Sequence, residues 1–567
     1  MKLAPLLILF PALAQATIST STSTPSFSFT PSTSHSASPS PWPTHTFHTT
    51  HATVPILNIT KSGPTALGLI FIAPSTGTSG SPAIYTDEGD LVWHGPIGKT
   101  YAYQPQFLNG EPVLTFWQGH FVKGFGYGHI VILDSGYREI HRVTLPGTET
   151  KSARGQNFVT ATNESFPSYI DIHESTITEN GTILVTAVNV TQADLTPVGG
   201  RKDGWVQDAL VYELDIATNE VLFRWSAVEH MAQLSLDYVE FPLGEMGVNK
   251  TAPYEYPHLN SVAKYGEHYL VSSRYMCAVF LIDRKGDMLW LFHGQNGGTF
   301  TLPNNTTSRF CYQHDARIHV HTNPGQPNET ITLSLHNNAN ENSSKEPRLT
   351  TDLVFNLFPA NKTTALVSRT YDRQDPITAV SQGNYQSLSP NGTGHYLAGH
   401  GAVPKIEEYD QYGRLVMRGW FGAVKSDNGV FGTYDWTSYR AFRAEWHGRP
   451  EGRPDVFACK DRAGDGGYKL DVYVSWNGAT DVEGWRAWGG SSQNLGTDFK
   501  AEGEGDMRIL KHRIGKAGFE TRSIISLGSE NRVDVVAVEA IGGVGDGARS
   551  KVVAVASCAA SKEHPDL

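Results

Sequence analysis

Long apolar stretches are missing from this chain of 567 residues. Nowhere does it contain the roughly 18 consecutive apolar residues that a membrane-spanning helix needs. The apolar stretch at residues 3–13 is shorter, follows Lys2 and leads into the small-residue run 12–16. These features are typical of a secretory signal peptide, here residues 1–16, cleaved after Ala16. We therefore predict a secreted, extracellular protein with no membrane span.

Cysteine is scarce, with four residues in the whole chain. Four cysteines are too few for a disulfide-stapled scaffold, so the fold must depend on a hydrophobic core. No Cys-x-x-Cys occurs, and zinc-knuckle or thiol-redox motifs of that spacing are therefore excluded. In an oxidising compartment each cysteine is expected to pair, and four cysteines allow three pairings. We favour Cys277 with Cys311 and Cys459 with Cys558, because each pair then falls within one predicted domain.

An excess of basic residues is also absent. The chain has 45 Lys and Arg against 56 Asp and Glu, which gives a net charge of −11 and an isoelectric point near 6.0. Proteins that bind nucleic acid usually carry a basic surface that attracts the phosphate backbone. The charge balance therefore argues against a nucleic-acid partner.

Asparagine glycosylation motifs, in contrast, are abundant. The sequence holds eleven Asn-x-Ser/Thr sequons, more than chance supplies in a chain of this length. They are Asn58, Asn163, Asn180, Asn189, Asn249, Asn304, Asn305, Asn328, Asn342, Asn361 and Asn391. This excess predicts a glycoprotein, in agreement with secretion.

Composition divides the mature chain into three parts. Residues 17–52 are nearly all Ser, Thr, Pro and His, and since such a segment buries too little apolar surface to offset its ordering entropy, we predict a disordered stalk. Residues 53–445 contain short β-branched and aromatic runs without long helical periodicity. Residues 446–567 contain alternating runs such as 471–476 and 533–538. These runs predict a C-terminal β-sandwich domain of the immunoglobulin or fibronectin type.

The middle region repeats one hairpin pattern. A strand, an acidic residue with a glycine turn, and a second strand that ends in Trp occur at residues 83–93 and again at 279–290. Related hairpins occur at residues 130–140, 211–225, 353–367 and 406–420. Their spacing suits four-stranded blades with long loops, so we predict an all-β fold in which residues 53–445 form a six-bladed β-propeller. An array of β-sandwiches is the competing interpretation.

Histidines occur at matching places in this pattern. His173, His258 and His314 each occupy a strand-like position in successive repeats. Innermost strands of successive blades meet at the axis of a propeller, so we expect these three side chains to face one another. Further cationic or amide candidates in the same region are Arg274, Arg317, His400 and Asn260. No His-Glu-x-x-His spacing surrounds them, and we predict neither a metal nor a cofactor.

Several motifs follow one another in a fixed order along the chain. They include residues 256–262 (Tyr-Pro-His-Leu-Asn-Ser-Val), 269–274 (Tyr-Leu-Val-Ser-Ser-Arg) and 313–317 (Gln-His-Asp-Ala-Arg). Further members of the series are residues 126–130, 171–174, 204–208, 382–386 and 473–480. In this order the motifs resemble the arylsulfotransferase family of propeller type, and in particular its fungal secreted branch.

This resemblance implies an enzyme that moves a sulfuryl group from an aryl sulfate to a phenol without a nucleotide donor, through a transient histidine nucleophile. Imidazole suits that role because much of it is neutral near neutral pH. Matching the family's motifs residue by residue, the resemblance makes His258, His314 and Arg274 catalytic candidates. We add His400 as a fourth, and His173, Asn260 and Arg317 as substrate-binding candidates.

A propeller can also keep this fold without the chemistry. The alternative function is a non-catalytic secreted propeller that binds glycans or proteins, in which inner-strand His and Arg side chains only join neighbouring blades. The later repeat at residues 382–386 is followed by no histidine before His395 and His400, so the nucleophile stays open. The sulfuryl donor, the acceptor and the oligomeric state stay open as well.

Overall fold

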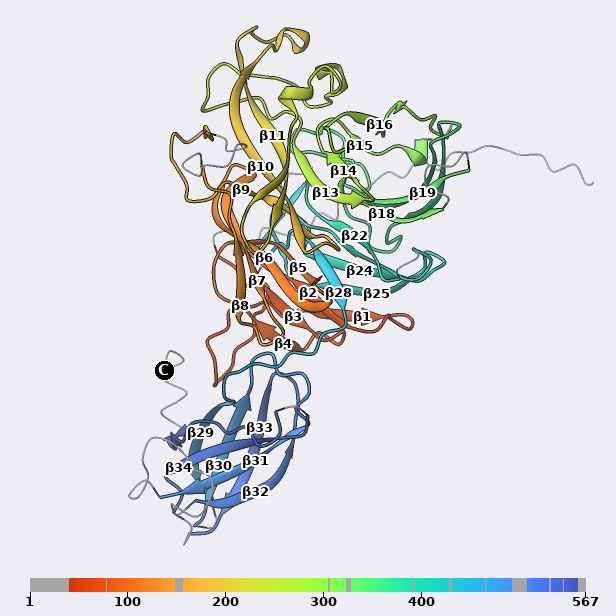
Figure 1. The fold of residues 1–567 in the computed structure, drawn as a ribbon. Helices are drawn as coiled ribbons and strands as arrows, with labels where there is room; N and C mark the ends of the chain where they lie inside the picture. The colour runs from red at the N-terminus through yellow and green to blue at the C-terminus, as the bar shows by residue number, and fades with distance from the viewer. Residues whose placement is uncertain are drawn as a thin grey trace, which may run out of the picture. The chain divides into compact units, whose positions relative to one another are not determined.

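Strands dominate the computed structural model, which describes residues 40–77, 79–147, 157–303, 306–322, 328–389, 392–427, 431–464, 466–491, 507–529, 532–543 and 545–558 (Figure 1). Short 3-10 helices connect some strands, at Thr196–Val198, Val228–His230, Leu236–Tyr238 and Thr306–Ser308. The predicted all-β class is confirmed. Among the described residues no helix has the length and apolar character to cross a bilayer. The predicted signal peptide and the sequons Asn304, Asn305 and Asn391 lie outside these residues.

Residues 58–444 form antiparallel sheets that follow one another along the chain. One sheet has the order β28 (Ala441–Ala444), β2 (Leu69–Ile72), β3 (Ala83–Tyr85) and β4 (Leu91–His94). An eight-stranded sheet combines β5 (Thr100–Leu108), β6 (Glu111–Val122), β7 (Phe125–Leu133) and β8 (Glu139–Val143) with β9 (Ile170–Ile177), β10 (Thr182–Ala193), β11 (Gly204–Asp215) and β12 (Val221–Ser226). Its two groups of four strands meet through the pairing of Gly128 with Ile170.

Three further sheets complete this region. The first contains β13 (Leu259–Tyr265), β14 (His268–Ser273), β15 (Ala278–Ile282), β16 (Met288–His293) and β17 (Gly297–Gly298). The second contains β18 (His314–Thr322), β19 (Thr330–Asn337), β20 (Thr351–Phe358) and β21 (Thr363–Thr370). The third contains β22 (Asn384–Ser387), β23 (Tyr396–Gly399), β24 (Lys405–Tyr409) and β25 (Leu415–Trp420), with β1 (Asn58–Lys61) paired to β25. A separate hairpin joins β26 (Val424–Asp427) to β27 (Gly432–Tyr434).

The hairpins form where their turn residues require them. Between β15 and β16, Oδ1 of Asp283 accepts hydrogen bonds from the backbone N–H groups of Lys285 and Asp287. Gly286 in the same turn has a φ of 91°, a value that glycine adopts without steric cost. The predicted pairing within residues 279–290 is therefore present, and its acidic residue and glycine have the expected turn role.

The first strands of these sheets lie next to one another. Strand β5 contacts β9, β9 contacts β13, β13 contacts β18, and β18 contacts β22. Strand β28 contacts both β5 and β23. Apolar side chains fill the space between neighbouring sheets, such as Trp225 against Phe280 and Phe292 against Phe355. The same arrangement draws the inner strands together from residues far apart in the sequence.

Residues after 445 form two further four-stranded sheets. One has the order β33 (Glu520–Leu527), β30 (Tyr468–Ser475), β29 (Asp455–Arg462) and β36 (Ala556–Ser557). The other has the order β32 (Arg508–Gly515), β31 (Gly484–Gly490), β34 (Val535–Ile541) and β35 (Val553–Ala554). Both sheets contribute to one apolar core, in which Val472, Ile525, Trp485 and Val538 are buried.

All four cysteines are paired as the sequence favoured. Cys277 bonds to Cys311, and Cys459 bonds to Cys558. The first pair lies among the strands of residues 58–444, and the second joins β29 to the end of the described chain. Each disulfide therefore falls within one of the two regions.

The packed part of the chain begins earlier than the predicted boundary at residue 53. Residues 40–52 belong to the described fold, and within them Phe47 packs on Phe519 with ring centroids 4.6 Å apart. The backbone N–H of Trp42 donates to Asp435, and that of Thr49 donates to Glu520 at 2.8 Å. The predicted disordered stalk is therefore wrong for residues 40–52. Two aromatic residues anchor this segment although Ser, Thr, Pro and His make up most of its composition.

Seven of the sequons predicted as glycosylation sites have exposed asparagines in the described residues. These are Asn58, Asn163, Asn180, Asn249, Asn328, Asn342 and Asn361. Asn189 differs because it lies within β10 with only 9% of its surface exposed, and its Oδ1 accepts a hydrogen bond from the backbone of Val159. A glycan at Asn189 would require this side chain to leave its place.

Candidate functional site

The first strands of successive groups bend near their starts, where their pairing is irregular. The pairing register shifts within β5, β13 and β18. It also shifts where β9 pairs with β10. Such β-bulges turn side chains in new directions and are frequent beside active sites. At these bends Ala102, His258 and Asp315 have φ values of 49°, 57° and 54°, which are uncommon for residues with a side chain. Because strained backbone of this kind clusters at functional sites, the bends mark where a site would form.

Glu174 on β9 is the centre of a buried ionic network at these bends. Its Oε1 lies 3.1 Å from Nη1 of Arg440, and its Oε2 lies 2.6 Å from Nη2 of Arg317. Asp315 on β18 places Oδ1 2.7 Å from Nη2 of Arg317 and 3.4 Å from Nε of Arg440. Arg440 also donates to backbone carbonyls on β9 and β13. One network thus joins β9, β13, β18 and the segment that leads into β28.

The charges of this network hold one another ionised. Burial alone would raise the pKa of Glu174, but the positive charges of Arg317 and Arg440 lower it to about 2. Burial opposes the charge of Arg440, yet Glu174 and Asp315 raise its pKa above the usual value. Buried charges are tolerated only when they are paired in this way. The network therefore depends on having all of its members.

Two histidines face each other beside the network. The ring centroids of His173 and His258 are 5.0 Å apart, with the rings nearly perpendicular at 79°. Nδ1 of His173 contacts the carboxylate of Asp171, and Nδ1 of His258 lies 3.2 Å from Oε2 of Glu255. Among the described residues neither Nε2 has a hydrogen-bond partner. Each ring is therefore oriented through one nitrogen and has the other available.

His258 is held as a neutral imidazole. Burial lowers its pKa well below the usual value, and the positive charges of His173 and Arg274 lower it further. The rings of Phe125 and Tyr275 pack against it with centroids at 4.5 Å and 4.7 Å. A neutral imidazole carries a lone pair that can attack an electrophile or accept a proton.

Arg274 supplies positive charge next to this pair of histidines. Its backbone N–H donates to the carbonyl of His258 at 2.9 Å, and its Nη2 donates to the carbonyl of Val380 at 2.8 Å. The guanidinium lies over the ring of Tyr275, 4.7 Å from its centroid. Its buried Nε–H has no partner among the described residues. A guanidinium with an unused N–H donor is well suited to bind an anionic oxygen.

His314 on β18 has both ring nitrogens engaged. Its Nε2 accepts a hydrogen bond from the backbone N–H of Gln382 at 3.1 Å, so Nδ1 is the protonated nitrogen and donates to Oδ1 of Asn338 at 2.7 Å. Burial lowers the pKa of His314 well below its usual value. The ring of Tyr439 lies 6.3 Å from that of His314 and 5.8 Å from that of His173. His314 thus lies close to the histidine pair but has no free nitrogen.

The two remaining substrate-binding candidates on β13 and β18 connect strands. Nδ2 of the fully buried Asn260 donates to the carbonyl of Gln313 at 2.6 Å, while its Oδ1 has no partner among the described residues. Arg317 is held by Glu174 and Asp315. Asn260 therefore has one polar atom available, and Arg317 is already paired.

His400 belongs to a second cluster of buried side chains. Its ring lies 5.3 Å from that of His336, and its Nε2 lies 3.0 Å from Oε2 of Glu407 on β24. His336 on β19 places Nδ1 2.7 Å from Oδ1 of Asp352 on β20. His336 also pairs across the strands with His314. We call His173, His258, Arg274 and Glu255 the first histidine group, and His336, Asp352, His400 and Glu407 the second histidine group.

Comparison with known protein families identifies the chain. The model of the family described as Arylsulfotransferase (ASST) matches residues 104–422, more than half of the sequence. The chain belongs to the arylsulfotransferase family. This membership supports an aryl sulfotransferase-like function with aryl sulfate and phenol substrates. No curated protein matches the sequence.

Solved structures resemble this arylsulfotransferase-family chain only weakly. An α-L-arabinanase from Penicillium chrysogenum is 11% identical with a TM-score of 0.28, and the match covers 73% of this chain and 94% of the arabinanase. Prolyl oligopeptidase B from Galerina marginata is 9% identical with a TM-score of 0.22, and the match covers 72% of this chain and 55% of the oligopeptidase. A post-proline cleaving enzyme from Rickettsia typhi is 9% identical with a TM-score of 0.22, and the match covers 72% and 58% of the two chains. Similarities this weak do not establish a common fold.

Sequence reasoning missed several residues of the arylsulfotransferase-family site. Glu174 was passed over although it directly follows His173, and Arg440 lies beyond the matched segment. His336 and Asp352 were missed because no motif singled them out, although they stand in the strands of residues 330–337 and 351–358. In a strand, side chains alternate between two faces. This alternation places His336 and Asp352 on a face with buried neighbours, where a polar residue is unusual. No local pattern in the sequence indicates that Glu174 pairs with Arg440, because the two residues are far apart along the chain.

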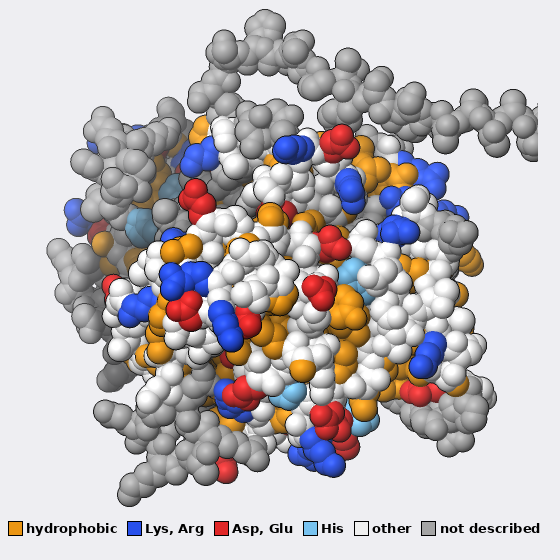
Figure 2. Space-filling view, turned by 90° about the horizontal axis from the view of Figure 1, so that it is seen from above, with side chains coloured by type: hydrophobic (Ala, Val, Ile, Leu, Met, Phe, Trp, Pro, Cys, Tyr) orange, Lys and Arg blue, Asp and Glu red, His pale blue; other side chains and the backbone are white. Residues whose placement is uncertain are grey.

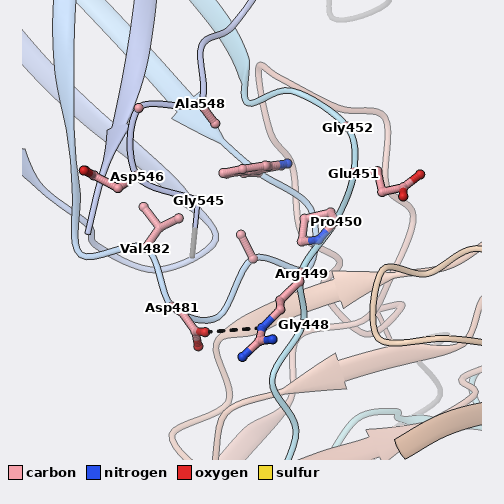
Figure 3. Close-up of a pocket in the computed structure, with 13 residues that line it drawn as sticks. Gly448, Arg449, Pro450, Glu451, Gly452, Asp481, Val482, Gly545, Asp546 and Ala548 are labelled. Carbon is pink, nitrogen blue, oxygen red and sulfur yellow. Dashed lines mark ion pairs between the residues drawn. The ribbon is translucent and has the colours of Figure 1, made fainter. Parts of the chain in front are cut away.

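The histidines of both groups in this arylsulfotransferase-family protein are buried, and no residue of either group lines the cavity shown in Figure 3. A cavity of about 410 Å³ opens between residues 448–452 and the loops of the C-terminal sheets, where Asp481 pairs with Arg449 (Figure 3). No predicted site residue lines it. The face shown in Figure 2 carries acidic and basic side chains intermixed, without a large area of one charge.

Replacing Glu174 with alanine would leave Arg440 and Arg317 without their central carboxylate. Removal of one partner from a buried ion pair costs about 3–5 kcal/mol, so we expect Glu174→Ala to lower the free energy of unfolding by that amount. In the wild type, ionised Glu174 adds to the free energy of unfolding. This stabilisation is complete above the ordinary carboxyl pKa of 4.5 and is lost as the pH falls toward 2. The measurement is denaturant unfolding at neutral and acidic pH.

The matched control for this substitution is Glu179→Ala, because Glu179 is exposed in a turn between β9 and β10. This control should change the free energy of unfolding by less than about 0.5 kcal/mol. Equal stability of the Glu174 and Glu179 variants would show that the network does not hold the inner strands.

Proposed function

We propose that this protein transfers a sulfuryl group from an aryl sulfate to a phenol through His258. The observation that carries the proposal is the state of that side chain. Burial lowers its pKa well below the usual value, Nδ1 lies beside Glu255, and Nε2 has no partner among the described residues. Family membership supports the same reaction class.

The reaction balances in two displacements. In the first, the Nε2 lone pair of His258 attacks sulfur, an N–S bond forms, and the S–O bond to the aryl group breaks to release a phenolate. In the second, the oxygen of an acceptor phenol attacks the same sulfur and the N–S bond breaks, which restores the imidazole. Two displacements of this kind divide one difficult transfer into two easier steps.

Neighbouring side chains would supply the proton and the charge that these steps need. His173 lies 5.0 Å from His258 and has Nδ1 on Asp171, an arrangement that stabilises imidazolium and leaves Nε2–H free. His173 gives this proton to the departing phenolate and regains one from the acceptor phenol. Arg274 offers its unpaired Nε–H to the sulfuryl oxygens, on which negative charge is concentrated.

The other candidates receive positioning roles in this proposal. His314 uses both nitrogens to hold Gln382 and Asn338, so it fixes the loop at residue 382. Asn260 has only its Oδ1 available, and Arg317 keeps Glu174 ionised. His400 is paired with Glu407 in the second histidine group and takes no part in the transfer.

The fold and location fit the same proposal. We infer that the sheets of residues 58–444 are six blades of a propeller, since their first strands contact one another in a closed series. Two sheets around one core favour a C-terminal sandwich after residue 445. The expected signal peptide and the exposed sequons favour a secreted glycoprotein.

The direct test replaces His258 with alanine and measures transfer from 4-nitrophenyl sulfate to phenol. We expect wild-type activity and a loss of at least about 100-fold in kcat/KM for His258→Ala, because the nucleophile is missing. The matched control is His512→Ala, which removes an exposed histidine on β32 and should leave kcat/KM unchanged. Protein quenched in alkaline denaturant, which preserves the acid-labile N–S bond, should carry the sulfuryl group on His258 in peptide mass spectra.

Two outcomes would reject the assignment. If wild-type protein and blank turn over equally, the protein has no such activity, and the alternative of a non-catalytic glycan- or protein-binding propeller is favoured. If the sulfuryl group is found on another histidine, the reaction class stands and the nucleophile is wrong.

The pH dependence offers a second test. Because the pKa of His258 is lowered, its imidazole stays neutral under mildly acidic conditions. The acidic limb of the first, phenolate-releasing step should therefore have its midpoint below pH 6.5, and rapid-quench measurement of phenolate release between pH 4 and 8 gives it. A midpoint at or above 6.5 contradicts the neutral-imidazole account.

A further inference from the structure

The second histidine group brings three metal-binding residue types together in the interior. His336 and Asp352 are fully buried, and His400 is 2% exposed. One candidate ligand atom from each of these side chains lies within 4.8 Å of those of the other two. The three residues come from β19, β20 and the turn after β23. They are therefore held by two adjacent sheets and not by one flexible loop.

Each histidine of this group has one nitrogen close to a carboxylate, and that of His336 forms a hydrogen bond there. Nδ1 of His336 lies 2.7 Å from Oδ1 of Asp352, and Nε2 of His400 lies 3.0 Å from Oε2 of Glu407. Metal-binding histidines almost always donate their second N–H to a carboxylate or carbonyl, which fixes the tautomer and directs the lone pair of the other nitrogen to the metal. The ring nitrogens without a hydrogen bond are Nε2 of His336 and both nitrogens of His400. Since Nε2 of His400 lies beside Glu407, Nδ1 is the nitrogen of that ring left to offer a lone pair.

These atoms have no protein partner. Within the described part of the chain, Nε2 of His336, Nδ1 of His400 and Oδ2 of Asp352 are buried and form no hydrogen bond. Buried polar atoms are nearly always paired, and each exception in a native protein needs a reason. A bound cation would satisfy all three atoms at once.

The local charge balance also favours a cation. Glu407 has a basic partner in Lys405, whose Nζ lies 2.6 Å from Oε1, and Asp372 has partners in Lys405 and Arg418. Asp352 has no basic partner among the described residues except His336. A fully buried carboxylate in that position needs additional positive charge.

The backbone of Gly383 lies against the ring of His336. A methyl group at Gly383 would lie 2.6 Å from Nε2 of His336, so a side chain there would clash with the ring. Gly383 has a φ of 99°, which glycine adopts readily. The backbone therefore approaches His336 closely without covering Nε2 by a side chain.

We propose that His336, His400 and Asp352 bind a divalent first-row transition-metal cation, with Zn²⁺ as the type. Two imidazole nitrogens and one carboxylate oxygen are a usual ligand set for zinc and related ions, and a solvent molecule completes such sites. Glu407 orients His400 and is not itself a ligand, because Lys405 holds its other oxygen. The site is separate from the first histidine group and does not depend on the proposed sulfuryl transfer.

The test measures Zn²⁺ and Co²⁺ binding to the full-length secreted protein after treatment with a chelator. We expect one equivalent of Zn²⁺ by elemental analysis, and visible absorption bands of low-symmetry Co²⁺ when Co²⁺ is added instead. His400→Ala should abolish stoichiometric binding. Glu407→Gln, which changes only the orienting carboxylate, should weaken it about 10- to 100-fold.

The matched control is His512→Ala, which removes an exposed histidine on β32 and should bind like wild type. Failure of the chelator-treated wild type to take up either metal would overturn the proposal, whatever the variants do. Unchanged affinity and Co²⁺ spectrum in both His400→Ala and Glu407→Gln would overturn it too, since the ion would then lie elsewhere. Because these readouts do not involve turnover, they are distinguishable from a failure of the sulfotransferase assignment.

Discussion

The pairing of Glu174 with Arg440 is the interaction on which the interior depends. These residues are 266 positions apart, and both are fully buried. A lone buried charge would be strongly unfavourable, so each residue requires the other. Through Arg317 and Asp315 the same network fixes the bends of β9, β13 and β18. Those bends hold His173 and His258 face to face.

Both histidine groups place buried imidazole rings beside carboxylates, but they differ in the charge around the free ring nitrogens. In the first, carboxylates orient His173 and His258 while Arg274 supplies positive charge with a spare donor. In the second, His336 forms a hydrogen bond with Asp352 and His400 lies 3.0 Å from Glu407, while Asp352 has no basic partner among the described residues except His336. Positive charge favours an anionic sulfuryl group, whereas uncompensated carboxylate favours a cation. The groups therefore suit different ligands, although His314 and His336 are strand neighbours.

Local signals in the sequence predict much of this fold. Acidic residues and glycines mark the hairpin turns, such as Asp283 and Gly286, because turn chemistry acts within a few residues. The approach of His173 to His258 was also predictable, since the repeats place them at similar positions, whereas Glu255 beside His258 was not. Arg440 was not, because its role comes from long-range pairing, and His336 was missed although alternation along its strand places it on a buried face. Residues 40–52 were misassigned because average composition hides single anchors such as Phe47.

In the proposed reaction, Nε2 of His258 is the nucleophile that attacks the sulfur of the aryl sulfate. A crystal structure of the protein with an unreactive aryl sulfonate tests this assignment directly. The account predicts the sulfonate sulfur within about 3.5 Å of Nε2 of His258, the approach distance of a reacting pair, with a sulfonate oxygen at Arg274. A sulfonate bound beside His336 and His400, with His258 free of contact, would contradict it.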